Sequence, residues 1–129
     1  MRPLAFPWEM ALHHHRARLE TAESRLRDAN ETLTQVEDQL SALQASRRQL
    51  RKRLAALFAA NPSRQQVGRV QARLADLWLQ MLSLRPLVRR RGHRVHELEG
   101  RRYRANRDVE SLERVKSRKL AAAVPLAAS

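Results

Sequence analysis

A long repeat of apolar residues constrains the fold of this chain more than any other feature. With Leu12 at position a of a seven-residue repeat, residues 12–57 place apolar side chains at almost every a and d position, and only His15 and Arg47 interrupt the pattern. A 3-4 spacing maintained over this length is typical of a coiled coil, because the apolar face of a globular helix is wider. We therefore expect a long helix over about residues 8–60, with a narrow apolar stripe that needs a partner.

The partner is expected in the same chain, where a second repeat with the same spacing begins at Val67. This repeat weakens beyond Gly100, as Arg and Lys take several of its a and d positions. We expect a second helix over about residues 65–122 that ends before Pro125, because proline lacks the N–H that continues a helix. Pro86 lies inside the same repeat, so a kink or a local break is expected there.

The segment between the repeats has the composition of a tight turn. Pro62 is expected to hold Asn61 in an extended conformation, and Ser63 with Gln66 forms a capping box for the second helix. With a turn at about residues 61–64, the chain is predicted to be all-α, a single hairpin of two long helices that form an antiparallel coiled coil.

The two repeats also predict which residues face each other. In an antiparallel pair the residue numbers of facing positions have a constant sum, and a sum near 124 places each a position of one helix opposite a d position of the other. This register pairs Leu43 with Met81 and Leu50 with Leu74. One register therefore satisfies both stripes.

The composition argues against an enzyme. Among 129 residues there are three Gly, no Cys and 4% aromatic residues, which leaves little material for a sheet, a pocket wall or a disulfide. No P-loop, nucleophile motif or carboxylate pair is visible, and a two-helix hairpin has no enclosed pocket. The consecutive histidines at residues 13–15 diverge on a helix, and His93, His96 and Glu97 lack a further ligand, so neither a metal nor another cofactor is expected.

The chain is strongly basic, and its charge is unevenly distributed. It has 26 Lys and Arg against 13 Asp and Glu, a net charge of +13, and residues 61–129 alone carry 16 against 6. Such a field favours an anionic partner, which could be a nucleic acid, an anionic membrane surface or an acidic protein. Residues 1–11 lack the continuous apolar region of a signal peptide, and no apolar run approaches the ~20 residues of a membrane span, so a cytoplasmic protein without membrane insertion is expected.

Near the turn, the second helix carries more apolar residues than its stripe requires. Trp78, Leu79 and Leu82 fall at positions e, f and b, and Phe58 lies at position e of the first helix. Exposed groups of this kind mark protein–protein contacts, and a wider stripe that partly covers Trp78 is the alternative. The basic block at residues 47–53 is either a second docking element or a solvated face.

A short, basic, antiparallel two-helix coiled coil with arms of equal length and free ends resembles the FliJ/YscO (SctO) family, the central stalk proteins of flagellar and type III secretion export ATPases. The resemblance covers the whole chain and rests on architecture, size and charge. It implies a non-enzymatic stalk or adaptor whose partners are the hexameric export ATPase, an export gate protein and secretion chaperones. It also implies a location in the cytoplasm or at the cytoplasmic face of the inner membrane.

The same resemblance implies two sets of binding residues. The terminal end of the hairpin would enter the ATPase ring, and the part near the turn would face the gate or the chaperones. The ATPase set is the cationic group Arg16, Arg18, Arg101, Arg104, Arg107, Arg114 and Arg118. The gate set is Arg48, Arg51, Phe58, Trp78, Leu79 and Leu82.

Two other functions are compatible with the sequence. In a nucleic-acid-associated helical protein, the Arg-rich second helix would follow phosphates without sequence preference. The spread of Arg around the helices, and the lack of a known binding module or an aromatic stacking platform, argue against this alternative. In a self-associating scaffold or chaperone, Trp78 and Leu82 would form the contact between copies.

Overall fold

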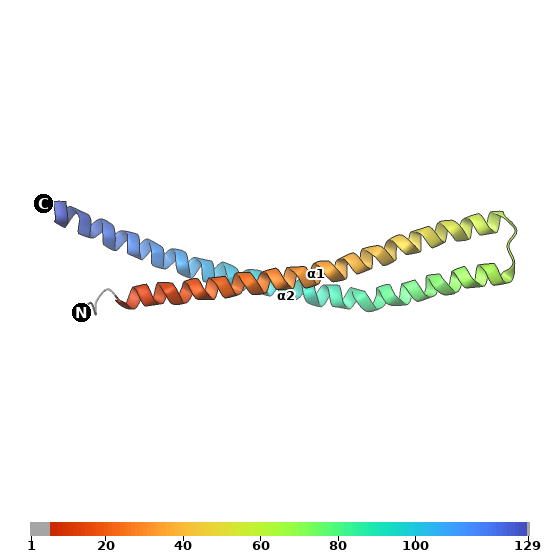
Figure 1. Cartoon of the computed structure of the whole chain (residues 1–129), viewed down its shortest axis with the longest axis horizontal. Coiled ribbons are helices and arrows are strands. Elements are labelled where there is room, and N and C mark those ends of the chain that lie inside the picture. Colours follow the sequence, from red (N-terminus) through yellow and green to blue (C-terminus); the bar gives the residue numbers. More distant parts are fainter. Residues whose placement is uncertain (1–5, 129) are drawn as a thin grey trace. The chain divides into compact units, whose positions relative to one another are not determined.

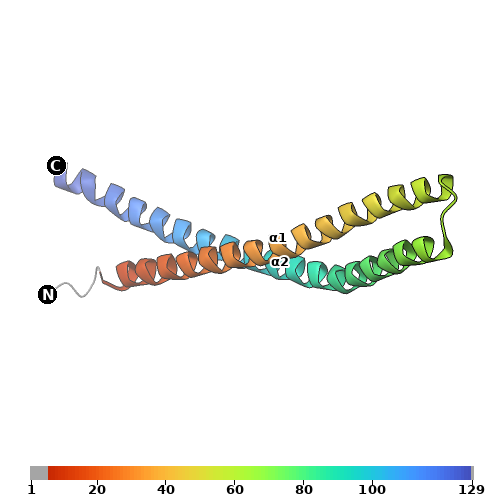
Figure 2. The ribbon, with the colours of Figure 1, turned by 45° about the vertical axis from the view of Figure 1, so that its right-hand side comes forward.

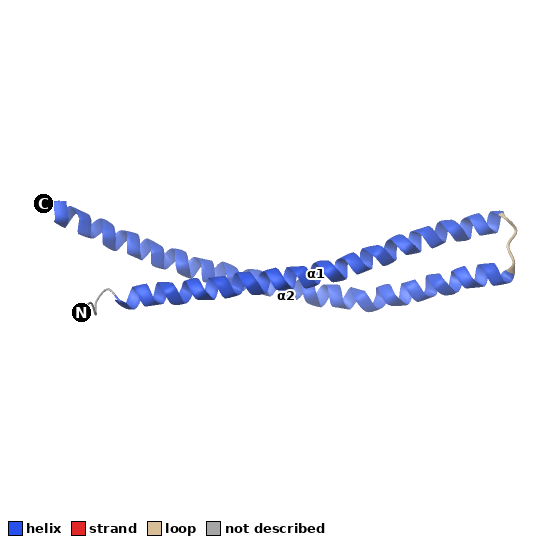
Figure 3. Ribbon diagram, in the orientation of Figure 1, coloured by secondary structure: helices blue, strands red, loops and turns tan. Residues whose placement is uncertain are grey.

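The computed structural model describes the backbone of residues 6–128 and the side chains of residues 7–122. It contains two α-helices, α1 at Phe6–Ala59 and α2 at Arg64–Ala128, and the described residues form no strand (Figure 1; Figure 3). The helices pack against each other in opposite chain directions, which confirms the predicted all-α hairpin. No helix within residues 6–128 is both long enough and apolar enough to span a bilayer.

The packing divides the chain into two compact units, each with its own stretch of α1 and of α2. The terminal unit consists of Met1–Ala29 and Val95–Ser129, and the turn unit consists of Asn30–Arg94. In the turn unit a short connection joins the end of α1 to the start of α2 (Figure 2). Each unit has its own apolar seam, built from the a and d positions of the repeat.

In the terminal unit, buried residues from both helices form the seam. Helix α1 contributes Leu12 and Leu26, whereas α2 contributes Leu98 and Val109, and all four are buried. Arg102, at an a position of α2, is instead exposed to solvent. The seam of this unit is therefore incomplete at the layer of Arg102.

In the turn unit, the seam is centred on Leu77 and Met81 of α2, which are 1% and 2% exposed. Val36 is buried on α1, and the other a and d residues of α1 in this unit are half-buried. A two-helix pair covers each seam residue from one side only, which explains why few residues are fully buried. The burial pattern agrees with the predicted a and d positions in this unit except at Arg91, a d position of α2 that is exposed.

One contact in each unit agrees with the predicted register. In the terminal unit, His15 Nδ1 lies 3.9 Å from Asp108 Oδ2. In the turn unit, the guanidinium carbon of Arg47 lies 4.8 Å from the centre of the Trp78 ring. The residue numbers of these pairs sum to 123 and 125, so a sum near 124 holds within both units.

The connection between the helices contains the predicted capping box. The Ser63 N–H donates to Gln66 Oε1 at 3.0 Å, and the Gln66 N–H donates to Ser63 Oγ at 3.3 Å. The prediction of an extended Asn61 is wrong, because its φ of 56° lies in the left-handed region. Asn tolerates this region better than most residues, and the residue that follows a helix commonly adopts it to close the last turn.

Neither Pro86 nor Pro125 breaks α2, and the predicted end before Pro125 is wrong. The helix passes through Pro86 without a break, and it ends at Ala128 rather than before Pro125. A proline deletes a single N–H···O bond, and the seam residues Leu84 and Val88 remain packed on either side of Pro86. The residues around Pro125 include several alanines, which have the highest helix propensity.

We expect a disulfide between Leu50→Cys and Leu74→Cys to form within one chain. The register places these residues in one layer of the turn unit, and the chain has no native cysteine that could compete. Non-reducing gels after oxidation should show a monomer of altered mobility. The control is Leu50→Cys with Ala72→Cys, because Ala72 is exposed on the outer side of α2. Intermolecular disulfides alone for the first pair would contradict the hairpin.

Leu77→Ala and Leu79→Ala make the same chemical change two residues apart on α2. Leu77 is 1% exposed and Leu79 is 64% exposed. We expect Leu77→Ala to lower the free energy of unfolding by about 2–4 kcal/mol, and Leu79→Ala to change it by less than about 0.5 kcal/mol. Urea unfolding followed by circular dichroism measures both. Equal losses would show that Leu79 is packed in the folded chain.

Candidate partner-binding surfaces

The turn unit holds most of the net positive charge. It has thirteen Lys and Arg against four Asp and Glu, a net charge of +9, whereas the terminal unit has thirteen against nine, a net charge of +4. A comparison of the two sequence halves cannot detect this difference, because each unit takes residues from both helices. Both units attract anions, and the turn unit does so more strongly.

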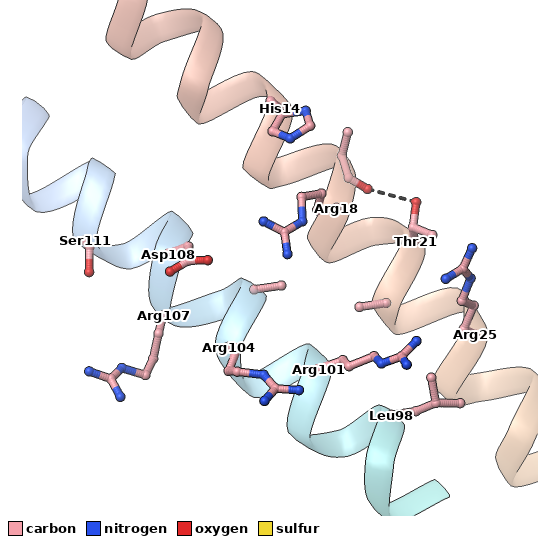
Figure 4. Close-up of a pocket in the computed structure, with 13 residues that line it drawn as sticks. His14, Arg18, Thr21, Arg25, Leu98, Arg101, Arg104, Arg107, Asp108 and Ser111 are labelled. Atoms are coloured by element: carbon pink, nitrogen blue, oxygen red, sulfur yellow. Dashed lines mark hydrogen bonds between the residues drawn. The ribbon is translucent and has the colours of Figure 1, made fainter. Parts of the chain in front are cut away.

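The terminal unit contains a groove between α1 and α2 with a volume of about 810 Å³. Arg18 of α1 and Arg101 of α2 extend into the space between the two helix segments, and Arg107 points away from α1 (Figure 4). Five arginines and the carboxylate of Asp108 belong to the lining. The five are Arg18, Arg25, Arg101, Arg104 and Arg107.

This groove forms where the seam loses its large side chains. In the predicted register Ala22 of α1 faces Arg102 of α2, and Arg102 is exposed. Ala105, at the next seam position of α2, is buried but small. Because the layer of Ala22 and Arg102 lacks a large apolar side chain, the space between the helices stays open there between the arginines at its rim.

None of the five groove arginines makes an ion pair within the described part of the chain. The Asp108 carboxylate lies 3.9 Å from His15 Nδ1, which is beyond hydrogen-bond distance. The groove can therefore hold carboxylates or phosphates through charge-assisted hydrogen bonds. Among the described residues, no group of three or more His, Cys, Asp or Glu is placed to hold a metal ion. The groove arginines without an ion pair are Arg18, Arg25, Arg101, Arg104 and Arg107.

The structure brings only part of the predicted ATPase set together. Arg16 pairs with Glu113 at 3.1 Å, and Arg114 and Arg118 lie outside the groove lining. Sequence reasoning missed Arg25, although its g position beside the seam is the signal that could have found it. The four predicted residues that share the groove are Arg18, Arg101, Arg104 and Arg107.

In the turn unit, two arginines lie over the ring of Trp78. The guanidinium carbons of Arg47 from α1 and Arg85 from α2 lie 4.8 Å and 5.0 Å from the ring centre. This contact explains why a cation occupies a seam position at Arg47, because its charge meets an aromatic face while its stem packs along the seam. Trp78 is 37% exposed, so it is partly covered, whereas Leu79 and Leu82 remain exposed.

Beside Trp78 lies a hollow of about 250 Å³ with a cationic rim. None of its arginines makes an ion pair with a described residue. The carboxylate of Asp76 is already engaged, since it accepts hydrogen bonds from Arg73 at 2.8 Å and from Gln80 at 3.1 Å. The four arginines that line this hollow are Arg47, Arg48, Arg51 and Arg85.

The predicted gate set is also only partly gathered. Arg48 and Arg51 line the hollow beside Trp78. Phe58 is exposed, but the register places it near Gln66, several helical turns from Trp78. Phe58 therefore does not belong to the same surface.

Comparisons with known proteins do not assign a function. No family model, curated protein or solved structure matches the chain. The cationic groove of the terminal unit and the Trp78 surface of the turn unit are therefore the features from which function can be argued.

The contact between Arg47 and Trp78 can be measured with a double-mutant cycle. We expect Arg47→Ala and Trp78→Ala to be coupled by about 0.5–1 kcal/mol in the free energy of unfolding, the range of a cation–π pair near the surface. Urea unfolding of the wild type, both single variants and the double variant gives the coupling. Arg51→Ala with Trp78→Ala is the control, because Arg51 lines the hollow without lying over the ring. Additive effects for the first pair would contradict the contact.

Proposed function

We propose that this chain is a non-enzymatic coiled-coil stalk or adaptor of a type III protein export apparatus. In this proposal the terminal unit binds the ring of a hexameric export ATPase in the cytoplasm, and the turn unit binds an export gate protein or a secretion chaperone. The groove of the terminal unit carries the proposal, because it gathers five arginines in a unit whose net charge is only +4.

A cationic groove of this kind suits an acidic protein surface. Guanidinium groups bind carboxylates through paired hydrogen bonds, and their field accelerates the encounter with an anionic partner. Arg18, Arg101 and Arg104 make no ion pair with a described residue. Their charge can therefore meet a partner without the loss of an internal ion pair.

The turn unit supports the adaptor part of the proposal. Leu79 and Leu82 expose apolar area beside Trp78, and exposed groups of this kind anchor protein–protein contacts. This surface and the groove belong to different units. Either surface can therefore be altered without a direct change to the other.

A nucleic-acid-associated protein is the second candidate, and the net charge of +9 in the turn unit favours it. Its binding would weaken steeply with salt, because each phosphate contact releases counterions. Single-stranded nucleic acids also bind through bases that stack on aromatic rings. The Trp78 ring is instead occupied by Arg47 and Arg85, so we rank this candidate second.

Charge reversal in the groove should weaken ATPase binding. We expect Arg101→Glu with Arg104→Glu to lower the affinity for the export ATPase by at least about tenfold, since attraction is replaced by repulsion at two positions. Pull-down with the purified hexamer and stimulation of its ATP hydrolysis are the measurements. The matched control is Arg89→Glu with Arg90→Glu, which makes the same change in net charge at exposed positions of the turn unit.

Two results would contradict the stalk. One is an equal loss of affinity for both double variants, which would show that ATPase binding depends on the net charge of the chain and not on the groove. The other is a wild-type chain that ignores the ATPase but retains DNA or RNA at physiological salt, with the retention abolished by nuclease. The second candidate would then replace the first.

A further inference from the structure

The outer side of α2 carries a second apolar stripe within the turn unit. The six successive b and f positions between residues 68 and 86 are uncharged, and all six are exposed. They have the same 3-4 spacing as the seam, but they lie on the opposite side of the helix. We name this the outer stripe, and it consists of Gly68, Ala72, Ala75, Leu79, Leu82 and Pro86.

The outer stripe is confined to one stretch of the described helices. Beyond Pro86 the next b and f positions of α2 are Arg89 and His93, and on α1 such positions include Glu31 and Asp38. The stripe extends for about 27 Å at 1.5 Å per residue, about five turns of helix. A surface of this length and spacing matches the side of another α-helix.

The composition of the stripe favours a helix over a lipid surface. Gly68, Ala72 and Ala75 are small, so a second helix can approach the backbone of α2 closely along this half. Leu79 and Leu82 supply the larger apolar groups on the other half. An interfacial membrane helix instead needs large apolar side chains along its whole buried face, which this stripe lacks.

The charges beside the stripe indicate the sign of its partner. Trp78 and Arg85 occupy e positions, which adjoin the b positions of the stripe, and Arg85 is one of the four arginines around the hollow. A second copy of the chain would bring a net charge of +9 against the same charge. A partner with carboxylates on its flank would instead satisfy guanidinium groups that have no ionic partner among the described residues.

We infer that the outer stripe binds an amphipathic helix of a partner protein whose apolar side is flanked by Asp or Glu. Leu79 and Leu82 are the apolar anchors, and Arg69 and Arg85, at exposed c and e positions of α2 that border the stripe, hold the flanking carboxylates. This inference rests on the adaptor part of the proposed function and not on ATPase binding. The partner of the turn unit would then present an apolar helix face flanked by carboxylates.

A synthetic helix of 21 residues (about six turns) can test the inference on the full chain. The probe has Leu and Ala at its a and d positions and Glu at its flanking positions, and two comparison peptides carry Gln or Lys at the flanks. Trp8→Phe leaves Trp78 as the reporting tryptophan, and Trp8 lies in the terminal unit. We expect the Glu peptide to bind at least about tenfold more tightly than the Gln peptide, and the Lys peptide not to bind at physiological salt.

Variants separate the stripe from the rest of the chain. Leu79→Ser with Leu82→Ser should weaken binding of the Glu peptide at least about tenfold with unchanged helical circular dichroism. Gly68→Leu should weaken it as well, because a large side chain keeps a second helix away from the backbone of α2, whereas an added Cβ at Gly68 meets nothing within 4 Å in the chain itself. The matched control is Tyr103→Ser with Leu120→Ser, which removes two exposed apolar groups from the terminal unit and should leave the affinity unchanged.

Three outcomes would overturn the inference. Equal binding of the Glu and Lys peptides would show that the arginines do not select an acidic partner. Unchanged binding by Leu79→Ser with Leu82→Ser would show that the outer stripe is not the binding surface. A dimer in sedimentation equilibrium that the same double variant dissociates would make a second copy the occupant. Because no ATPase is present in these measurements, their failure is distinct from failure of the stalk proposal.

Discussion

The narrow apolar seam between two antiparallel helix segments is the interaction on which the rest of the structure depends. Burial of apolar area stabilises each pair of segments, but a two-helix pair buries only the a and d positions of each repeat. Five positions in seven are therefore free of packing constraints. This freedom explains how a chain of 129 residues can carry a groove, a hollow and an outer stripe without a globular core.

Both cationic sites lie where the seam departs from its repeat. The layer of Ala22 and Arg102 lacks a large apolar side chain, and the groove of the terminal unit opens there. At Arg47 the seam admits a cation, whose guanidinium group lies over Trp78 beside the hollow. An interruption that weakens packing thus creates space and charge at the same place. The seam therefore determines where a partner can bind as well as how the helices pair.

The repeat and the turn residues were sufficient to predict the helices, their direction and the capping box at Ser63. These features depend on neighbours in sequence or on a strict period, and both are visible in one chain. The end of α2 before Pro125 was predicted wrongly, and the helix has no break at Pro86, because the loss of one hydrogen bond has to be weighed against packing and propensity along the whole helix. The left-handed Asn61 was missed for a related reason, since the closure of the preceding helix outweighed the preference imposed by Pro62.

The candidate sites could be predicted only in part, because they combine residues from two helices whose pairing must be known first. Arg47 of α1 reaches across the seam to the ring of Trp78, which Arg85 of α2 also contacts. The role of Arg25 depends on which residues of α2 it faces. Exposure of Leu79 and Leu82 followed from the repeat alone, since positions f and b never face the seam. Sequence thus identifies the outer positions of a single helix better than it identifies a site shared by two.

The charge of the turn unit is difficult to explain by stability. Between residues 39 and 96, Asp76 is the single carboxylate among thirteen cations. Repulsion among these cations therefore destabilises the folded unit. Salt screens this repulsion and therefore stabilises the unit, but the same screening weakens attraction to an anionic partner. Stability and affinity thus respond to salt in opposite directions. In a purely structural hairpin, Glu at the outer positions would stabilise the helices through i,i+4 pairs with Arg or Lys. The first part of α1 contains such pairs. The composition of residues 39–96 therefore suits the proposed partner, whose own carboxylates would supply the missing negative charge.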